Sequence, residues 1–346
     1  MNLRRLLLPF SGLYWIGTSV RNMLYNIGMM RTTSFNIPII NVGNLSVGGT
    51  GKSPHIMYLI DLLKNEKLVS SLSRGYGRKT KGFLIANYST KVYDIGDEPL
   101  QFFQRFKNRV LIAVCEDRVF GAKKLIDHYN AETILLDDAY QHRSIKAGFN
   151  ILLTDYNNPY YKDYLLPAGD LRESSSGVKR ANIIIVTKCP DRISEEKHKE
   201  ISKKIKLKSH QQLFFSKIVY DNKIIGKLDT IEKSTWKNYN VILVTGIAKT
   251  DGLVKFAEEN FANVSHLEYP DHHNFSQTEI EYIYKRYEDT EGRKRFDKIV
   301  LTTEKDYMRL MEESMIKDDL YYIPISIEIN DKEKFNQTIL EYVGQN

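Results

Sequence analysis

The chain has 346 residues, of which 42% are hydrophobic and 27% are charged, and its formal net charge is +7. This length suits two domains, and this composition excludes an intrinsically disordered chain. The cysteines Cys115 and Cys189 are too few for a disulfide framework or a cysteine-rich metal site, which fits a reducing, cytosolic setting. The positive charge predicts an acidic partner, which could be a nucleic acid, an anionic lipid or a phosphorylated substrate.

Residues 3–30 are apolar and aromatic, yet their longest uncharged run, residues 6–20, is shorter than the roughly 20 residues that span a bilayer. Arginines suited to anionic head groups flank this run: Arg4, Arg5, Arg21 and Arg31. A signal peptide is disfavoured because no small-residue cleavage site follows. We expect a helix attached to an anionic membrane surface, with a helix packed on the protein's own core as the alternative.

Residues 42–54, VGNLSVGGTGKSP, form a glycine-rich loop between an expected strand at 37–42 and a helix with apolar periodicity. This is the context of a phosphate-binding P-loop, in which Lys52 reaches the β- and γ-phosphates and Ser53 binds Mg²⁺. Ser46 stands where the first glycine of the motif is usual, and a plain turn before a helix is the alternative. The expected nucleotide contacts are Val47, Gly48, Gly49, Thr50, Gly51, Lys52, Ser53 and Pro54.

Two later loops carry polar side chains that have both a functional and a structural explanation. Arg74 and Tyr76 follow an expected strand at 68–73, and they could receive an anionic or sugar ligand or lie on a solvated turn. Asp97 and Glu98 precede an apolar helical pattern and could simply cap that helix. Two carboxylates at such a junction also suit phosphoryl transfer, which needs a general base and a metal ligand.

Polar residues also follow two further strands, expected at 110–114 and 133–136. Arg118 could offset charge on a transferring phosphoryl group, or it could be an ordinary arginine at the start of a surface helix. Asp137 and Asp138 are typical of a Walker-B-like metal site but are also common turn formers. Because the chain already has a P-loop that needs such a partner, the metal role is favoured.

The alternation of strands and helices continues with strands expected at 150–154 and 183–187. Gln141 and His142 follow the paired aspartates and could face the same cleft. Arg172 could bind an anionic substrate group or lie on a solvated turn. The pair at 187–188, Thr-Lys, begins a guanine-reading motif, but a proline occupies the position of its aspartate, so this motif fails.

The second half of the chain opens with apolar runs at 213–220 and 223–228, which predict a hairpin and a domain boundary. Asp271, His272 and His273 then form a polar cluster that could be a metal site, a general-base relay or, from the residues alone, a turn. The strands and helices expected around it are strands 241–245 and 298–303 and helices 253–261 and 278–287, and Thr303 and Asp306 have capping-box spacing.

In order along the chain, these motifs resemble those of the tetraacyldisaccharide 4′-kinase family, the lipid A 4′-kinases of Gram-negative bacteria. The matching motifs are GN at 43–44 with VGGTGKSP at 47–54, SRGYG at 73–77, GDEP at 96–99, EDR at 116–118, LDD at 136–138 with QH at 141–142, PAG at 167–169 with LRE at 171–173, DH at 271–272, and TEKD at 303–306. The departures are Ser53, where threonine is frequent, and the Ala139-Tyr140 pair, where Gly-Phe is more usual.

The resemblance implies an α/β fold, with a P-loop NTPase-like α/β/α domain and a smaller α/β/α domain joined by a two-stranded β linker. The implied division is a membrane-associated helix at 1–30, the kinase domain at 31–211, the linker at 212–228 and the smaller domain at 229–346. The implied activity is transfer of the γ-phosphate of ATP, with Mg²⁺, to the 4′-hydroxyl of a tetraacylated glucosamine disaccharide 1-phosphate. It would occur at an anionic membrane surface, the cytoplasmic face of the inner membrane, with no nucleic acid and no obligate protein partner.

The resemblance also implies roles for individual residues. Asp97 would be the general base, paired with His272, while Lys52 and Arg118 would act on the phosphoryl group. Metal ligands would be Ser53, Glu98, Asp137 and Asp138, and substrate contacts would be Asn44, Arg74, Tyr76, Gln141, His142 and Arg172. A P-loop nucleotide switch or metallochaperone is the alternative function, and a DHH-type phosphoesterase would leave the P-loop unexplained.

Overall fold

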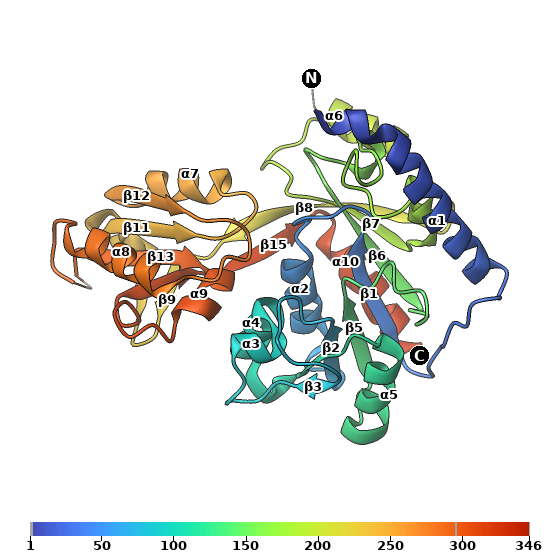
Figure 1. Ribbon diagram of the computed structural model, residues 1–346, viewed down its shortest axis with the longest axis horizontal. Coiled ribbons are helices and arrows are strands. Elements are labelled where there is room, and N and C mark those ends of the chain that lie inside the picture. Colours follow the sequence, from blue (N-terminus) through green and yellow to red (C-terminus); the bar gives the residue numbers. More distant parts are fainter. Residues whose placement is uncertain (1–2, 295, 346) are drawn as a thin grey trace.

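Two sheets, each covered by helices on both faces, make up the computed structural model, which describes residues 3–294 and 296–345 (Figure 1). The larger sheet has the strand order β15-β8-β7-β6-β1-β5-β2-β4-β3. Its strands are β1 (Ile39–Asn44), β2 (Val69–Ser73), β3 (Leu84–Ile85), β4 (Leu111–Val114), β5 (Thr133–Asp137), β6 (Phe149–Asp155), β7 (Ile183–Thr187), β8 (Gln212–Tyr220) and β15 (Ile325–Ile329). All neighbours are parallel except the edge strands β3 and β15.

The smaller sheet has the order β10-β9-β14-β13-β11-β12. Its strands are β9 (Lys223–Gly226), β10 (Thr230–Glu232), β11 (Asn240–Thr245), β12 (Asn263–Glu268), β13 (Lys298–Thr303) and β14 (Leu320–Ile323). The α-helices among the described residues are α1 (Leu8–Asn26), α2 (Lys52–Leu63), α3 (Val92–Ile95), α4 (Asp97–Phe106), α5 (Arg118–Tyr129), α6 (Glu195–Ile205), α7 (Asp251–Asn260), α8 (Gln277–Glu288), α9 (Glu304–Leu310) and α10 (Lys332–Gly344). The strand and helix alternation predicted from the sequence is confirmed, and so is the α/β fold class.

The apolar faces of the helices account for these layers. Ile60 of α2, Phe102 of α4 and Ile339 of α10 are buried together on one face of the larger sheet. Leu125 of α5 and Ile205 of α6 belong to cores on the opposite face. Burying both faces explains why the central strands are continuous apolar runs rather than alternating ones.

The hairpin predicted between residues 213–220 and 223–228 is wrong. Strand β8 pairs antiparallel with β15, from Tyr220 opposite Ile325 to Ser216 opposite Ile329, whereas β9 pairs with β10 and β14. The turn residues between the two runs are compatible with a hairpin, but Ile327 and Ile329 bring apolar side chains that the core of the larger sheet buries. The pair β8–β15 therefore forms one edge of the larger sheet and extends from it toward the smaller sheet (Figure 1).

The end of the chain returns to the larger sheet. Phe335, Ile339 and Val343 of α10 are buried in the same core as β1 and α2. The predicted domain boundaries at 211 and 228 therefore stay a prediction. Strand β15 and helix α10 belong to the predicted range 229–346, but they pack on the larger sheet. Residues 1, 2, 295 and 346 of the predicted ranges lie outside the described residues.

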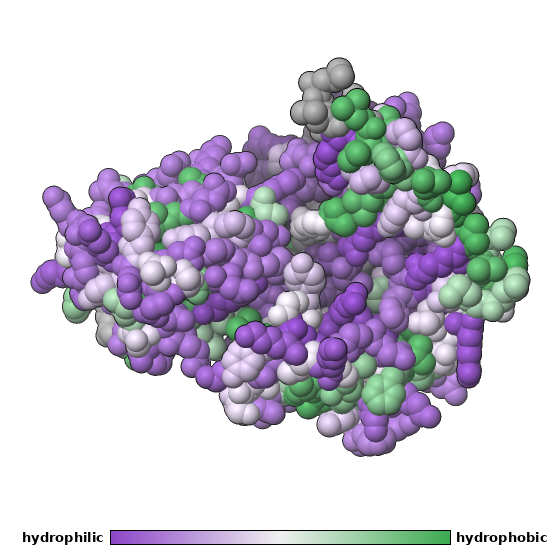
Figure 2. All heavy atoms as spheres, viewed as in Figure 1, coloured by the Kyte–Doolittle hydropathy of each residue, from purple (hydrophilic) through white to green (hydrophobic). Residues whose placement is uncertain are grey.

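Helix α1 lies on the surface with apolar side chains facing outward. Phe10, Leu13, Ile16, Val20 and Met23 recur at helical spacing and are each at least 46% exposed, as is Leu6 in the short 3-10 helix before α1. Its inward side is polar instead, because Ser11 Oγ donates to Leu165 O at 2.9 Å and Tyr14 OH donates to Arg172 O at 2.8 Å. Figure 2 shows the resulting apolar band along α1. Within residues 3–294 and 296–345, no helix is both long and apolar enough to cross a bilayer.

Candidate active site

The P-loop lies where parallel strands of the larger sheet end, the edge at which open α/β sheets bind ligands. Gly48 and Gly51 have φ of 97° and 85°, which only glycine adopts without strain, and Gly51 is the residue before α2. Thr187 Oγ1 donates to Thr50 O at 2.9 Å, and Lys188 Nζ donates to Gly49 O. Thr187 and Lys188, the pair that only partly matches a guanine-reading motif, thus hydrogen-bond to backbone carbonyls of the P-loop.

Carboxylates gather beside the first turn of α2. Ser53 Oγ donates to Glu98 Oε1 at 2.9 Å, and Lys52 Nζ lies 3.7 Å from Asp138 Oδ1. Asp137, at the end of β5, is 2% exposed, and its Oδ1 has no hydrogen-bond partner among the described residues. Burial, with a further contribution from the charge of Glu98, raises the pKa of Asp137 to about 8. A buried, unpaired carboxylate oxygen beside a second carboxylate and a hydroxyl is a donor set that suits a divalent cation.

Two arginines reach the same group of carboxylates. Arg118 is 3% exposed and donates to Cys115 O at 2.9 Å, and its Nε has no partner within the described chain. Burial lowers the pKa of Arg118, while the nearby charges of Asp137 and Asp138 oppose that shift. Arg172 is fully engaged, because it donates to both oxygens of Asp138 at 3.0 and 3.1 Å and to Asn44 Oδ1.

Asp97 meets side chains from the other sheet. It lies in the first turn of α4, one residue before Glu98, and is 2% exposed. Its Oδ2 lies 3.1 Å from His272 Nδ1 and 3.8 Å from Lys305 Nζ, and it accepts a hydrogen bond from Arg309 Nη2. Burial raises the pKa of Asp97, but the His272 hydrogen bond and the charges of Lys305 and Arg309 outweigh burial and leave the pKa below its ordinary value. Asp97 is therefore held as a carboxylate.

Local structure explains how Asp97 comes to this position. Helix α4 begins at Asp97 with Gly96 as its N-cap, so Asp97 and Glu98 are its first two residues and neither is the cap that the sequence pattern allowed. Gly96 has φ 90°, and a Cβ there would lie 2.6 Å from Tyr76 O. Only glycine permits this approach of the 74–77 loop, which places the Tyr76 ring 4.9 Å from the His272 ring.

The loop that carries His272 is anchored to α9. The backbone N–H of His272 donates to Gly246 O at 3.1 Å, and the N–H of Gly246 donates to Asp306 Oδ2 at 2.9 Å. Thr303 caps α9 by accepting from the Asp306 N–H at 3.0 Å, so the predicted capping role is confirmed. Asp306 thereby joins the start of α9 to the His272 loop.

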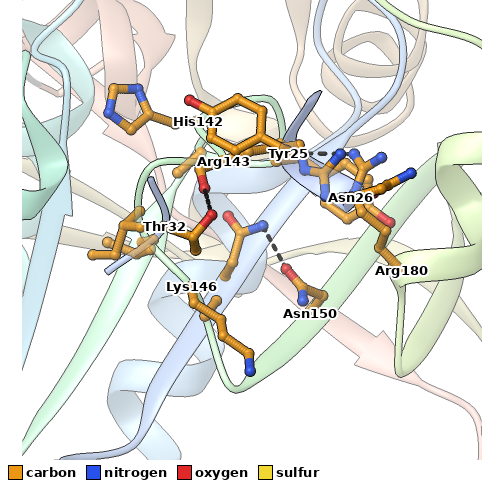
Figure 3. Close-up of a pocket in the computed structure, with 14 residues that line it drawn as sticks. Tyr25, Asn26, Thr32, His142, Arg143, Lys146, Asn150 and Arg180 are labelled. Carbon is orange, nitrogen blue, oxygen red and sulfur yellow. Dashed lines mark hydrogen bonds between the residues drawn. The ribbon is translucent and has the colours of Figure 1, made fainter. Parts of the chain in front are cut away.

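A separate pocket of about 370 Å³ lies between the end of α1 and the larger sheet (Figure 3). Its lining includes His142, Arg143, Lys146 and Arg180, and none of the described lining residues is acidic. Asn41 donates to Asn150 Oδ1 at 3.0 Å within it. The charged side chains that line the pocket are thus basic, and His142 links it to the predicted substrate residues.

The structure brings together most of the predicted site. One group lies in or around the P-loop and consists of Lys52, Ser53, Glu98, Asp137, Asp138, Arg118, Asn44, Arg172 and Gln141. A second group lies where the two sheets meet and consists of Asp97, His272 and Tyr76. Arg74 is exposed on the neighbouring loop. Sequence reasoning missed Arg309 and left Lys305 without a chemical role. The sequence pattern that could have indicated both residues is their i, i+4 spacing just after the capped start of a helix, because this spacing places the two side chains on one helix face.

Comparisons with known proteins give a consistent result. A family model described as tetraacyldisaccharide-1-P 4′-kinase (LpxK) matches residues 3–344. The chain is 46% identical to a tetraacyldisaccharide 4′-kinase of Flavobacterium johnsoniae, covering 99% of this chain and 98% of that protein, and 41% identical to one of Bacteroides fragilis, covering 100% and 95%. A crystal structure of LpxK from Aquifex aeolicus in complex with ATP matches with a TM-score of 0.76 and 29% identity over 99% of both chains.

Proposed function

Because the chain belongs to the tetraacyldisaccharide-1-P 4′-kinase family, we propose that it transfers the γ-phosphate of ATP to the 4′-hydroxyl of a tetraacylated glucosamine disaccharide 1-phosphate. One observation carries the assignment of the reacting groups. Asp97, paired with His272, is adjacent in the chain to Glu98, which bonds to Ser53 of the P-loop. A potential base is therefore held next to the nucleotide site.

The residues have separable tasks in this reaction. As the 4′-oxygen bonds to the γ-phosphorus, the bond from that phosphorus to the β–γ bridging oxygen breaks and its electron pair leaves with ADP. Asp97 accepts the proton of the 4′-hydroxyl, and Lys52 and Arg118 stabilise negative charge on the phosphoryl oxygens. Positioning and charge stabilisation supply most of the catalysis in phosphoryl transfer, so a carboxylate with a lowered pKa still suffices as a base.

The carboxylates beside the P-loop fit a Mg²⁺ site. Ser53, Glu98 and Asp137 would hold the ion, and Asp138, which Lys52 and Arg172 already engage, would border it. The support is the unpartnered, buried Oδ1 of Asp137 next to Glu98, an arrangement that costs free energy until a cation neutralises it. Held by these residues, the ion would supply positive charge that neutralises phosphate oxygens.

The acceptor is a lipid, and helix α1 offers a way to reach it. An outward stripe that includes Phe10, Leu13 and Ile16 would enter the interfacial region of an anionic membrane, the cytoplasmic face of the inner membrane. Polar contacts on the other side of α1 hold it to the connection between β6 and β7. The basic pocket at the end of α1 lies beside His142, where the acceptor's own phosphate would meet cations rather than carboxylates.

The test follows label from γ-labelled ATP and Mg²⁺ with the tetraacyldisaccharide 1-phosphate in mixed micelles. We expect label in the lipid, and we expect the Lys52→Met variant to lose it because the lysine that reaches the phosphates is absent. Label that appears only as free phosphate, at a rate that the lipid does not change, would contradict the proposal and favour a nucleotide switch.

A further inference from the structure

Helix α9 presents two cations to the Asp97–His272 pair. Lys305 and Arg309 are one turn apart on the same helix face, and their side chains are only 17% and 8% exposed. Lys305 Nζ lies 2.9 Å from His272 Nε2, 3.2 Å from Asp271 Oδ1 and 3.8 Å from Asp97 Oδ2. Arg309 Nη2 donates to Asp97 Oδ2, and Nη1 donates to His273 O at 2.8 Å.

These contacts determine where His272 carries its proton. A lysine ammonium only donates hydrogen bonds, and Lys305 also forms ion pairs with Asp271 and Asp97. Arg309 Nη2 also lies 3.2 Å from His272 Nδ1, but it already donates to Asp97 Oδ2, whereas His272 Nε2 meets the Lys305 ammonium at 2.9 Å. His272 Nε2 is therefore the acceptor of the uncharged ring, and the ring proton lies on Nδ1, which is 3.1 Å from Asp97 Oδ2. The opposite tautomer would place an N–H against the ammonium and leave no proton between His272 and Asp97.

The same contacts distinguish the two oxygens of Asp97. The His272 and Arg309 hydrogen bonds and the Lys305 ion pair all reach Oδ2. Because these donors occupy one side of the carboxylate, Oδ1 is the oxygen that is left to accept the proton of the acceptor hydroxyl. The orientation of the base thus depends on groups that another sheet supplies.

We propose that Lys305 and Arg309 are positioning residues of the transfer reaction: Lys305 fixes His272 as the Nδ1–H tautomer, and Arg309 holds Asp97 Oδ2. The expected loss of kcat rests on the proposed function, whereas the assignment of the His272 tautomer is independent of it. The anchoring of the His272 loop through Gly246 and Asp306 makes α9 the element that sets all these distances.

The structural part is tested in the full-length protein by ¹⁵N NMR of the histidine rings at neutral pH. Loss of a signal in His272→Gln identifies His272, and His273, whose Nε2 lies 3.0 Å from Glu279, is the internal reference for a proton on Nε2. We expect a proton on Nδ1 of His272 in the wild type and a shift toward the Nε2–H form in Lys305→Met. A wild-type His272 protonated on Nε2 alone would overturn the proposal without any variant.

The kinetic part uses Lys305→Met, Lys305→Arg and Arg309→Met, with the exposed Lys285→Met on α8 as the control. We expect kcat to fall about 10- to 100-fold in the two Met variants, a part of the usual acid–base contribution, with the KM for ATP unchanged. Lys305→Arg, which keeps a donor toward Nε2, should recover part of the loss. If Lys305→Met transfers phosphate to lipid at the wild-type rate, the inference fails while the function stands. If the wild type transfers none but shows the Nδ1–H tautomer, the function fails while the tautomer assignment stands.

Discussion

Among the site residues, Asp137 has the most unusual surroundings. Its side chain is buried at the end of β5, its Oδ1 has no partner within the described chain, and its pKa is raised to about 8. A buried carboxylate without a hydrogen-bond partner lowers the free energy of unfolding unless a ligand compensates for its charge. This burial, beside the charge of Glu98, is the basis for proposing a cation site there.

Asp137→Asn should remove the Mg²⁺ dependence of ATP binding. The amide keeps the shape of the side chain but no longer offers a negative oxygen to the ion, so we expect Mg²⁺ to tighten ATP binding in the wild type and to have little effect in the variant. Calorimetric titration with ATP, with and without Mg²⁺, measures this. The exposed Asp127→Asn is the control, and equal Mg²⁺ dependence in both variants would exclude Asp137 as a ligand.

Sequence patterns were informative for residues next to recognisable local structure. The P-loop, Asp97–Glu98 and Asp137–Asp138 each follow a strand or begin a helix, so their neighbourhood could be predicted from adjacent residues. The partners of Arg172 could not, because its contacts with Asp138 and Asn44 join segments more than 30 residues apart. Arg309 was missed for the same reason, since its partner Asp97 lies 212 residues away.

At the scale of elements, α1 has its apolar side turned away from the protein. This orientation disfavours the alternative of a helix packed on the protein's own core, because Leu13 and Ile16 are 69% and 53% exposed. The sequence could predict the apolar run but not its direction, which depends on polar contacts such as Ser11 with Leu165 and Tyr14 with Arg172.

Replacing Leu13 and Ile16 together by serine should weaken binding to vesicles that contain anionic lipid by about tenfold or more. Each side chain would lose apolar burial in the membrane, which is worth about 1.5–3 kcal/mol when complete. Vesicle co-sedimentation measures the effect, and Leu228→Ser, which removes an apolar side chain that is 58% exposed on the smaller sheet's side of the molecule, is the control. Unchanged binding of the double variant would contradict membrane attachment through this face.

Helix α10 is one of the elements to which the sequence analysis assigned no range. Its residues Phe335, Ile339 and Val343 recur at helical spacing, but the pattern does not indicate which sheet they cover. Their burial against β1 and α2, with β15 at the sheet edge, makes the end of the chain part of the larger sheet's core.

Phe335→Ala should destabilise the protein by about 3–5 kcal/mol, as is typical of a buried phenylalanine whose removal leaves a cavity. Denaturant unfolding measures the free energy of unfolding, and Leu340→Ala on the same helix, where the side chain is 39% exposed, is the matched control. A similar, small loss in both variants would mean that α10 does not contribute to this core.

At the scale of the whole molecule, the two sheets share an interface that also forms the site. Ile95 and Leu100, from α3 and α4, are buried in one cluster with residues of α8 and α9. Gln101 Nε2 of α4 donates to Glu304 Oε2 of α9 at 2.9 Å, and Lys249 Nζ lies 3.2 Å from Asp155 Oδ2 beside the P-loop. The two-domain architecture could be predicted by resemblance, whereas these contacts arise only when distant segments fold together.

Glu304→Gln should stabilise the protein increasingly as pH rises. Burial raises the pKa of Glu304, although the charge of Arg105 and the Gln101 hydrogen bond oppose this shift. Since the folded-state pKa exceeds the unfolded one, the unfolded state releases the proton first, and wild-type stability is lost as pH rises from about 4.5 through the folded pKa. Glutamine does not titrate, so unfolding at several pH values should show a difference that grows with pH. The exposed Glu258→Gln should show none, and a difference that shrinks with rising pH would refute the interpretation.

In the proposed reaction, groups from both sheets form one phosphoryl-transfer site. Single-turnover transfer of label from γ-labelled ATP to the lipid acceptor tests this in the wild type, Asp97→Asn, His272→Gln and the double variant. We predict a loss of about 100-fold or more in Asp97→Asn, a smaller loss in His272→Gln, unchanged ATP binding, and a double variant no slower than Asp97→Asn, because paired residues act as a unit. Losses that multiply in the double variant, or wild-type transfer by His272→Gln, would contradict a shared site.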